Sequence, residues 1–139
     1  MAISAQMRRV LAQKTPPGDA ALLQALKTSE VPAWIFEQET LRFVEVNESA
    51  LSRYGYKRDE FLTLTLLDIR PTSDIPTFLH TALLAPHSSV SPERWHHQTK
   101  SGEVFEVEIH SRETTFRGRQ AEIVLAMPIM ASACSEPGR

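Results

Sequence analysis

Histidine and cysteine side chains can act as metal ligands or as catalytic groups, and this 139-residue chain has five histidines and one cysteine. Two of the histidines are neighbours, His96 and His97, within a segment of strand-forming residues. Adjacent strand residues point to opposite faces, so this pair cannot chelate one metal ion from the same side. Trp95, His97 and Thr99 share one face, which predicts His97 as a sheet-face residue and predicts no metal site.

Catalytic groupings are absent from the sequence. Ser49 and Ser111 lie outside any nucleophile-elbow motif, and there is no glycine-rich phosphate loop. Glu106 and Glu108 alternate with apolar residues, as expected for a solvated strand face. The single cysteine, Cys134, cannot form an internal disulfide, which fits a reducing cytoplasm. We predict a cytoplasmic protein that is not an enzyme.

Composition excludes several classes of partner. A hydrophobic content of 42% and a charged content of 23% are ordinary for a soluble globular protein. The net charge of −2 gives no basic field for binding nucleic acid. The apolar runs are too short to span a membrane, and the N-terminal region lacks the apolar core of a secretion signal.

The chain begins with a predicted helical extension, residues 1–30. Residues 2–14 form the first predicted helix, and a second runs over residues 19–28, with Asp19 as its cap. The apolar stripe of the first helix consists of Ile3, Met7, Val10 and Leu11. Two alternatives remain open: a lid packed on the domain, or a dimerisation surface, because an isolated short helix needs an apolar partner.

Periodicity predicts a globular domain over residues 31–129. Strands over 33–37 and 41–46 read as a hairpin, and Asn47 then caps a two-turn helix that Gly55 ends. A short helical turn near residue 60 and a helix over residues 75–84 follow.

Three further strands are predicted over residues 93–100, 103–115 and 121–129, with a tight turn at Ser101-Gly102. The predicted class is therefore α+β: a five-stranded antiparallel sheet with short helices on one face. Residues 130–139 are predicted to be a flexible tail.

An ordered set of motifs over residues 31–129 resembles a PAS domain, closest to the PAS modules of bacterial sensor histidine kinases and cyclic-dinucleotide signalling proteins. The motifs are Val46-Asn47-Glu48-Ser49-Ala50, Tyr54-Gly55-Tyr56, Glu60-Phe61, Asp68-Ile69-Arg70-Pro71, Lys100-Ser101-Gly102 and Phe116-Arg117-Gly118. The resemblance implies a PAS fold, a sensory or interaction function, and a ligand pocket between helices and sheet. The pocket candidates are Phe36, Phe61, Leu67, Ile69, Phe78, Leu83, Trp95, His97, Ile109 and Val124. Asn47, Gly55 and Gly102 are expected to shape the backbone.

Departures from the PAS pattern limit the cofactors. Light-sensing flavin relatives carry a reactive cysteine in the helix after the Asn47 position, and Cys134 is far from it. Haem-binding relatives use a histidine on the long helix, where His80 lies one position off the apolar stripe, so a surface or boundary histidine is favoured. The Asp-x-Thr that often ends the last strand is replaced here by Met127-Pro128-Ile129-Met130. The usual signal exit is therefore missing.

Three hypotheses follow from the sequence. The first is a PAS sensory module that binds a small molecule and passes a signal to a partner or to an output domain outside this chain. The second is a homodimerisation module with a filled core, which uses the outer sheet face and the first-helix stripe. The third is haem sensing through His80.

Overall fold

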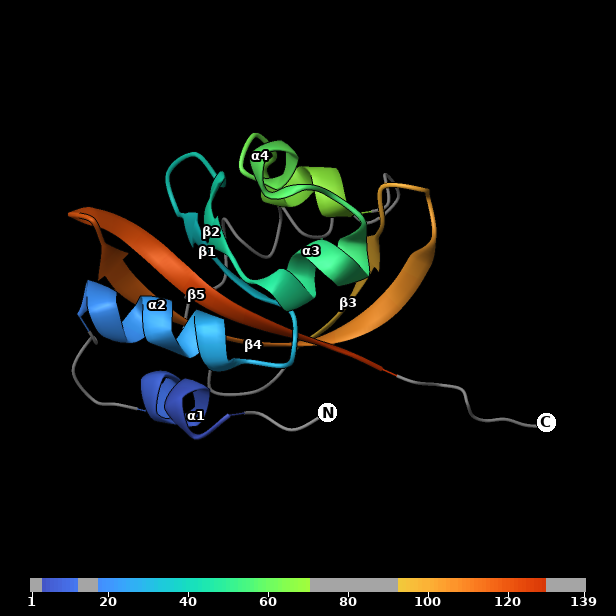
Figure 1. Ribbon diagram of the computed structural model, residues 1–139. Helices are drawn as coiled ribbons and strands as arrows, with labels where there is room; N and C mark the ends of the chain where they lie inside the picture. The colour runs from blue at the N-terminus through green and yellow to red at the C-terminus, as the bar shows by residue number, and fades with distance from the viewer. Residues whose placement is uncertain (1–3, 13–17, 71–92, 130–139) are drawn as a thin grey trace.

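The computed structural model describes residues 4–12, 18–70 and 93–129, in which five strands form one antiparallel sheet (Figure 1). The strands are β1 (Ala33–Glu37), β2 (Phe43–Val46), β3 (Glu93–Gln98), β4 (Val104–Phe116) and β5 (Arg119–Pro128). Their order in the sheet is β2-β1-β5-β4-β3, so the last strand lies between the first and the fourth. The predicted α+β class and the predicted β1–β2 hairpin are confirmed.

Helices cover both faces of the sheet (Figure 1). They are α1 (Ala5–Ala12), α2 (Asp19–Thr28), α3 (Glu48–Tyr54), α4 (Arg58–Phe61) and the short 3-10 helix η1 (Leu66–Ile69). Helices α3 and α4 lie on one face, whereas α1 and α2 lie on the other (Figure 1). The helix predicted over residues 75–84 lies outside the described residues, as does the predicted tail.

One hydrophobic core lies between the sheet and α3, α4 and η1. Its buried members are Trp34, Phe36, Phe43, Val46, Ala50, Tyr54, Phe61, Leu66, Ile69, Val107, Ile109, Val124 and Ala126. The alternation predicted for β4 explains this face, because Val107 and Ile109 point into the core while Glu106 and Glu108 stay partly exposed. We call this cluster the inner core.

A second core lies between α1, α2 and the opposite face of the sheet. Its buried members are Met7, Val10, Leu22, Ala25, Leu26, Val31, Ala33, Ile35, Phe116, Ala121, Ile123 and Leu125. Arg112 ties α1 to β4, because its guanidinium Nη1 donates to the Val10 carbonyl oxygen at 3.0 Å. We call this cluster the outer core. The N-terminal helices and the sheet therefore share one buried interior.

The start of α2 differs from the prediction that Asp19 caps it. Gly18 is the N-cap residue, and Asp19 is the first helical residue. The Asp19 carboxylate instead accepts hydrogen bonds from the backbone N–H of Arg117, with oxygens at 3.1 and 3.3 Å. This contact fixes the helix start against the β4–β5 turn.

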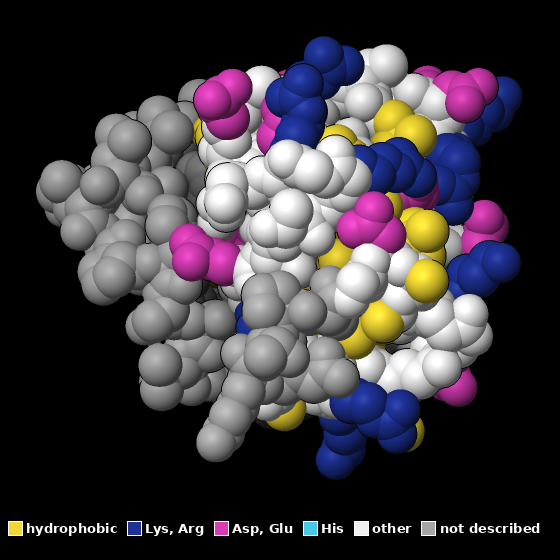
Figure 2. Space-filling view, turned by 90° about the vertical axis from the view of Figure 1, so that its left-hand side faces the viewer, with side chains coloured by type: hydrophobic (Ala, Val, Ile, Leu, Met, Phe, Trp, Pro, Cys, Tyr) yellow, Lys and Arg dark blue, Asp and Glu magenta, His cyan; other side chains and the backbone are white. Residues whose placement is uncertain are grey.

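Strands β4 and β5 form a hairpin whose tight turn has both of its residues in the left-handed backbone region. Arg117 has φ 52° and Gly118 has φ 80°, as a two-residue primed turn requires. The Arg117 guanidinium reaches across to Glu45 on β2 at 2.9 Å, and Arg58 bonds the same carboxylate at 3.1 Å. Seen from the left-hand side of Figure 1, basic and acidic side chains intersperse, with small hydrophobic areas between them (Figure 2).

Among the described helices, none has the length and apolarity needed to cross a membrane.

Candidate functional site

Asn47 joins three segments at the edge of the inner core. It is the N-cap residue of α3, the position that the sequence assigns to it, and its side chain is 5% exposed. The side-chain Oδ1 accepts from the backbone N–H groups of Ala50 (2.9 Å) and Ala33 (3.1 Å). The side-chain Nδ2 donates to the carbonyl oxygens of Val31 (3.0 Å) and Leu26 (3.1 Å). One amide thus holds the end of α2, the start of β1 and the start of α3 together.

Tyr54 and His97 form a buried polar pair inside the inner core. Tyr54 is the last residue of α3, and His97 lies on β3 opposite Phe105 of β4. The Tyr54 hydroxyl and His97 Nδ1 are 2.5 Å apart, and both side chains are fully buried. The ring centroid of Trp34 lies 5.7 Å from the ring centroid of Tyr54 and 5.7 Å from that of His97. The pair is therefore enclosed by aromatic side chains.

Burial sets the protonation states of this pair. It lowers the pKa of His97 well below its usual value, and the charges of Arg70 and His96 lower it further. Burial also raises the pKa of Tyr54 far above its usual value, although Arg70 and Arg53 oppose that shift. At neutral pH the imidazole is neutral and the phenol is protonated.

The tautomer of His97 follows from the contact with Tyr54. A neutral imidazole carries one proton, and we assign the Tyr54 hydroxyl as donor to Nδ1, which places the ring proton on Nε2. His97 Nε2 is buried and has no hydrogen-bond partner, and the same is true of the indole Nε1 of Trp34. Two buried N–H donors in the described part of the inner core are thus unsatisfied. Such groups favour an acceptor oxygen from water or from a ligand.

Most of the predicted pocket residues that the structure describes come together here. Five belong to the inner core: Phe36, Phe61, Ile69, Ile109 and Val124. Trp95 packs against it half-buried, with the Arg70 guanidinium 4.7 Å from its ring centroid, and Leu67 is half-buried on η1. Phe78, Leu83 and the haem candidate His80 lie outside the described residues.

Sequence reasoning missed Trp34 and Tyr54 as site residues. Trp34 shares its strand face with Phe36, so the alternation of β1 could have identified it. Tyr54 is part of the Tyr54-Gly55-Tyr56 motif, but nothing in the sequence indicates a hydrogen bond to a residue 43 positions away.

The structure also shows where the glycines expected to shape the backbone and the residues of the first-helix stripe lie. Gly55 ends α3 with φ 83°, and Gly102 has φ 99° between β3 and β4. Met7 and Val10 are buried in the outer core of their own chain, and Leu11 packs against it. Ile3 lies outside the described residues.

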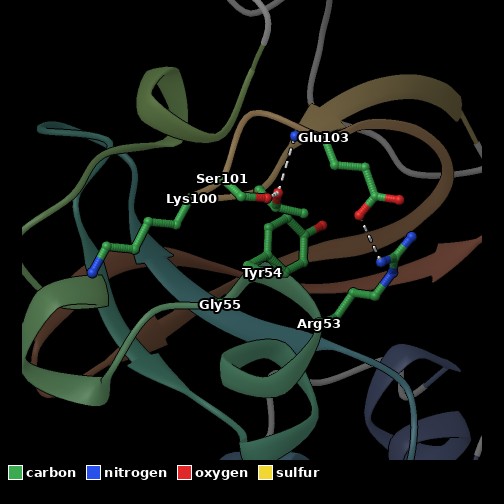
Figure 3. A pocket seen from close by; sticks show the side chains of 7 residues that line it. Arg53, Tyr54, Gly55, Lys100, Ser101 and Glu103 are labelled. Carbon is green, nitrogen blue, oxygen red and sulfur yellow. Dashed lines mark hydrogen bonds and ion pairs between the residues drawn. The ribbon is translucent and has the colours of Figure 1, made fainter.

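A separate pocket opens on the surface where α3 ends and β3 connects to β4 (Figure 3). Its volume is about 270 Å³. It is lined by Arg53, Tyr54, Gly55, Thr99, Lys100, Ser101 and Glu103. Tyr54 thus borders the outside pocket while its hydroxyl contacts His97 in the inner core. No group of three histidine, cysteine or acidic side chains in the described segments could hold a metal ion.

Solved structures share this fold, although no protein-family model and no curated protein sequence matches the chain. A PAS domain from a two-component sensor histidine kinase aligns at a TM-score of 0.65 with 18% identity, covering 79% of this chain and 94% of that one. A domain of a sensory box sensor histidine kinase/response regulator from Geobacter sulfurreducens aligns at 0.57 with 22% identity, covering 78% and 91%. The LOV protein of Rhodobacter sphaeroides aligns at 0.64 with 12% identity, covering 80% and 66%.

Identities this low establish a shared fold and no more. The strand order, the helices over the inner core and the extent of the alignments agree with the resemblance that the sequence motifs indicate. This chain has the fold of the PAS domains.

Proposed function

We propose that the chain is a sensory module of signal transduction that binds a small molecule in the inner core, at His97 and Trp34. The observation that carries this proposal is the pair of buried, unsatisfied N–H donors, Trp34 Nε1 and His97 Nε2, in a mostly apolar interior. A ligand that offers an acceptor oxygen would satisfy them, and leaving such donors unpaired costs about 1–3 kcal/mol each. The likeness to PAS domains of sensor histidine kinases supports a signalling role.

Tyr54 connects the proposed ligand position to the surface. Its hydroxyl contacts His97, and its carbonyl oxygen accepts from the backbone N–H of Lys100 at 2.9 Å. A ligand that changes the position of the His97 ring therefore acts on the end of α3 and on the β3–β4 connection together. It shifts the equilibrium between two arrangements only as far as its affinities for them differ. The signal then passes to a partner protein or to an output domain outside this chain.

Native mass spectrometry of the purified protein tests the ligand directly. We expect a species heavier than the chain that returns to the mass of the chain on denaturation. Trp34→Phe keeps a large aromatic ring but removes the N–H group, so it should release the bound species or weaken its binding about tenfold, the effect of one hydrogen bond of about 1.4 kcal/mol. Phe116→Leu changes an aromatic ring of the outer core instead, so it is the control and should retain the bound species. A protein that carries no bound species, with interior donors satisfied by water alone, would contradict the proposal.

Homodimerisation is the second candidate function. The observation behind it is the apolar stripe of α1, which covers its own sheet and would cover the same face of a second copy if the helix were exchanged. Met7 and Val10 are buried within one chain, so a dimer through this stripe requires α1 to leave its own sheet and pack on that of a second copy. Sedimentation of the full chain beside a chain that lacks residues 1–30 distinguishes the cases. If both sediment as monomers at micromolar concentration, this function fails.

A further inference from the structure

The cationic side chain of Arg53 lines the surface pocket at the end of α3 and packs over an aromatic ring. The guanidinium carbon of Arg53 lies 3.9 Å from the centroid of the Phe105 ring, a stacked cation–π contact. Its side chain is 32% exposed, so it is partly withdrawn from water. An arginine stacked in this way keeps the edge of its guanidinium free to donate hydrogen bonds in the plane of the group.

The acid beside Arg53 is weakly held. The Glu103 carboxylate lies 3.6 Å from the Arg53 guanidinium, beyond hydrogen-bond distance, and its side chain is 63% exposed. An exposed ion pair of this kind contributes about 0–1 kcal/mol. Figure 3 shows this carboxylate pointing to Arg53 at the side of the pocket. The Glu103 carboxylate is therefore an oxyanion beside Arg53 that an oxyanion from solution can replace.

The remaining polar groups of the pocket suit the same chemistry. The hydroxyls of Thr99 and Ser101 lie 3.0 Å apart, and Thr99 Oγ1 accepts from the backbone N–H of Glu103 at 3.2 Å. The Lys100 side chain runs away from the pocket centre (Figure 3) and pairs with Glu60 at 2.7 Å. That pairing neutralises the other nearby acid, so the Arg53 charge dominates once Glu103 moves aside.

We propose that this pocket binds a small oxyanion, a carboxylate or phosphate group, between the Arg53 guanidinium and the Ser101 hydroxyl, in place of the Glu103 carboxylate. A pocket of about 270 Å³ is slightly smaller than the sites of drug-sized ligands, so a small ion or a single acidic group fits it. This site is separate from the ligand position proposed in the inner core, although Tyr54 borders both.

The test is an NMR titration of the full chain with acetate and, separately, inorganic phosphate, at constant ionic strength. We expect saturable shifts of the backbone amide signals of residues 99–103. Arg53→Gln should weaken binding at least about tenfold, the effect of removing a charge-assisted hydrogen bond. Arg58→Gln changes an arginine that pairs with Glu45, outside the pocket, and should leave binding unchanged.

Glu103→Gln supplies a gain of function that misfolding cannot produce. Removing the competing carboxylate should tighten binding about threefold, and by no more than about fivefold, since the pair contributes up to about 1 kcal/mol. The preferred probe identifies the group: acetate indicates a carboxylate ligand and phosphate a phosphorylated one. Absence of saturable shifts with both probes, or equal weakening by Arg53→Gln and Arg58→Gln, would overturn the proposal.

Discussion

The Tyr54–His97 pair places two titratable groups where neither can carry a charge at low cost. Both side chains are fully buried, and the aromatic rings around them offer no counter-charge. Burial is the largest cause of both pKa shifts, and it acts in opposite directions on the acid and on the base. The pair is therefore a neutral hydrogen bond whose stability depends on pH.

His97 should make the protein less stable in mild acid. Its pKa is depressed in the folded state, so below a pH of about 6.5 the unfolded chain binds a proton that the folded chain does not. Stability is then lost as pH falls, by up to about 1.4 kcal/mol per pH unit. Urea unfolding at pH values from about 5 to about 8 measures this slope.

The matched variants separate His97 from the other histidines. His97→Phe keeps an aromatic ring but cannot titrate, so the free energy of unfolding should become flatter below a pH of about 6.5. His96→Gln changes the exposed neighbour on the opposite strand face and should retain the slope. An unchanged slope in His97→Phe would show that the folded protein tolerates the imidazolium.

Asn47 should contribute more to stability than an ordinary helix cap. Asn47→Ala removes the cap of α3 and leaves the buried N–H of Ala33 and the carbonyl oxygens of Leu26 and Val31 without this partner. The carbonyl oxygens of Leu26 and Val31 keep hydrogen bonds from Ser29, so only the Ala33 N–H becomes unsatisfied. A lost cap costs about 1 kcal/mol and one unsatisfied buried group about 1–3, so we expect a loss of about 2–4 kcal/mol. Thermal or urea unfolding measures it.

Ser49→Ala is the control for Asn47. Ser49 also bridges two segments, since its hydroxyl donates to the Glu30 carbonyl oxygen at 2.8 Å, but this contact is exposed. Water replaces an exposed hydrogen bond, so the loss should stay at about 1 kcal/mol or less. Equal losses in the two variants would mean that the buried hydrogen bonds of the Asn47 amide stabilise the fold no more than the exposed hydrogen bond of Ser49 does.

At the scale of elements, the β4–β5 hairpin aligns the two longest strands of the sheet. Its turn places Arg117 and Gly118 at positive φ, and the backbone N–H of Arg117 contacts the first residue of α2. Strand register and the position of the N-terminal helices therefore depend on one turn.

Gly118→Ala should destabilise this hairpin through backbone strain alone. A Cβ at Gly118 would meet nothing within 4 Å, but φ is 80°, and a left-handed non-glycine residue costs about 1–2 kcal/mol. Gly18→Ala is a matched control, because its Cβ also meets nothing within 4 Å while its φ is −72°. We expect a loss of about 1–2 kcal/mol for the first and less than about 1 kcal/mol for the second, which replaces an N-cap glycine without positive-φ strain. Equal urea midpoints would rule out strain at the turn.

At the scale of the molecule, sequence patterns determined the faces of the strands but not what covers them. Period-2 alternation placed Val107, Ile109 and His97 on the inner face, because a half-buried strand needs that pattern. The apolar stripe of α1 requires a partner, but the pattern is the same whether the partner is its own sheet or a second copy. Contacts such as Tyr54 to His97 depend on strand register and helix placement, which only the assembled fold sets.

The two cores lie on opposite sides of the same strands, so the protein should unfold as one unit. Trp34 and Ile35 are neighbours on β1, yet Trp34 belongs to the inner core and Ile35 to the outer core. Tryptophan fluorescence reports on the inner core through Trp34 and Trp95, whereas far-UV circular dichroism includes α1 and α2. Because loss of either core uncovers the shared strands, we expect both probes to give the same urea midpoint.

Met7→Ala tests this coupling from the far side of the sheet. Met7 is buried in the outer core, so its truncation should cost about 2–5 kcal/mol and shift the fluorescence transition as much as the dichroism transition. Arg8→Ala alters the exposed neighbour on α1 and should change the stability by about 0.5 kcal/mol or less. If Met7→Ala shifts only the dichroism signal, α1 and α2 unfold separately from the inner core. The N-terminal helices would then be free to leave the sheet while the ligand position in the inner core stays folded, which is the behaviour that dimerisation by exchange of α1 requires.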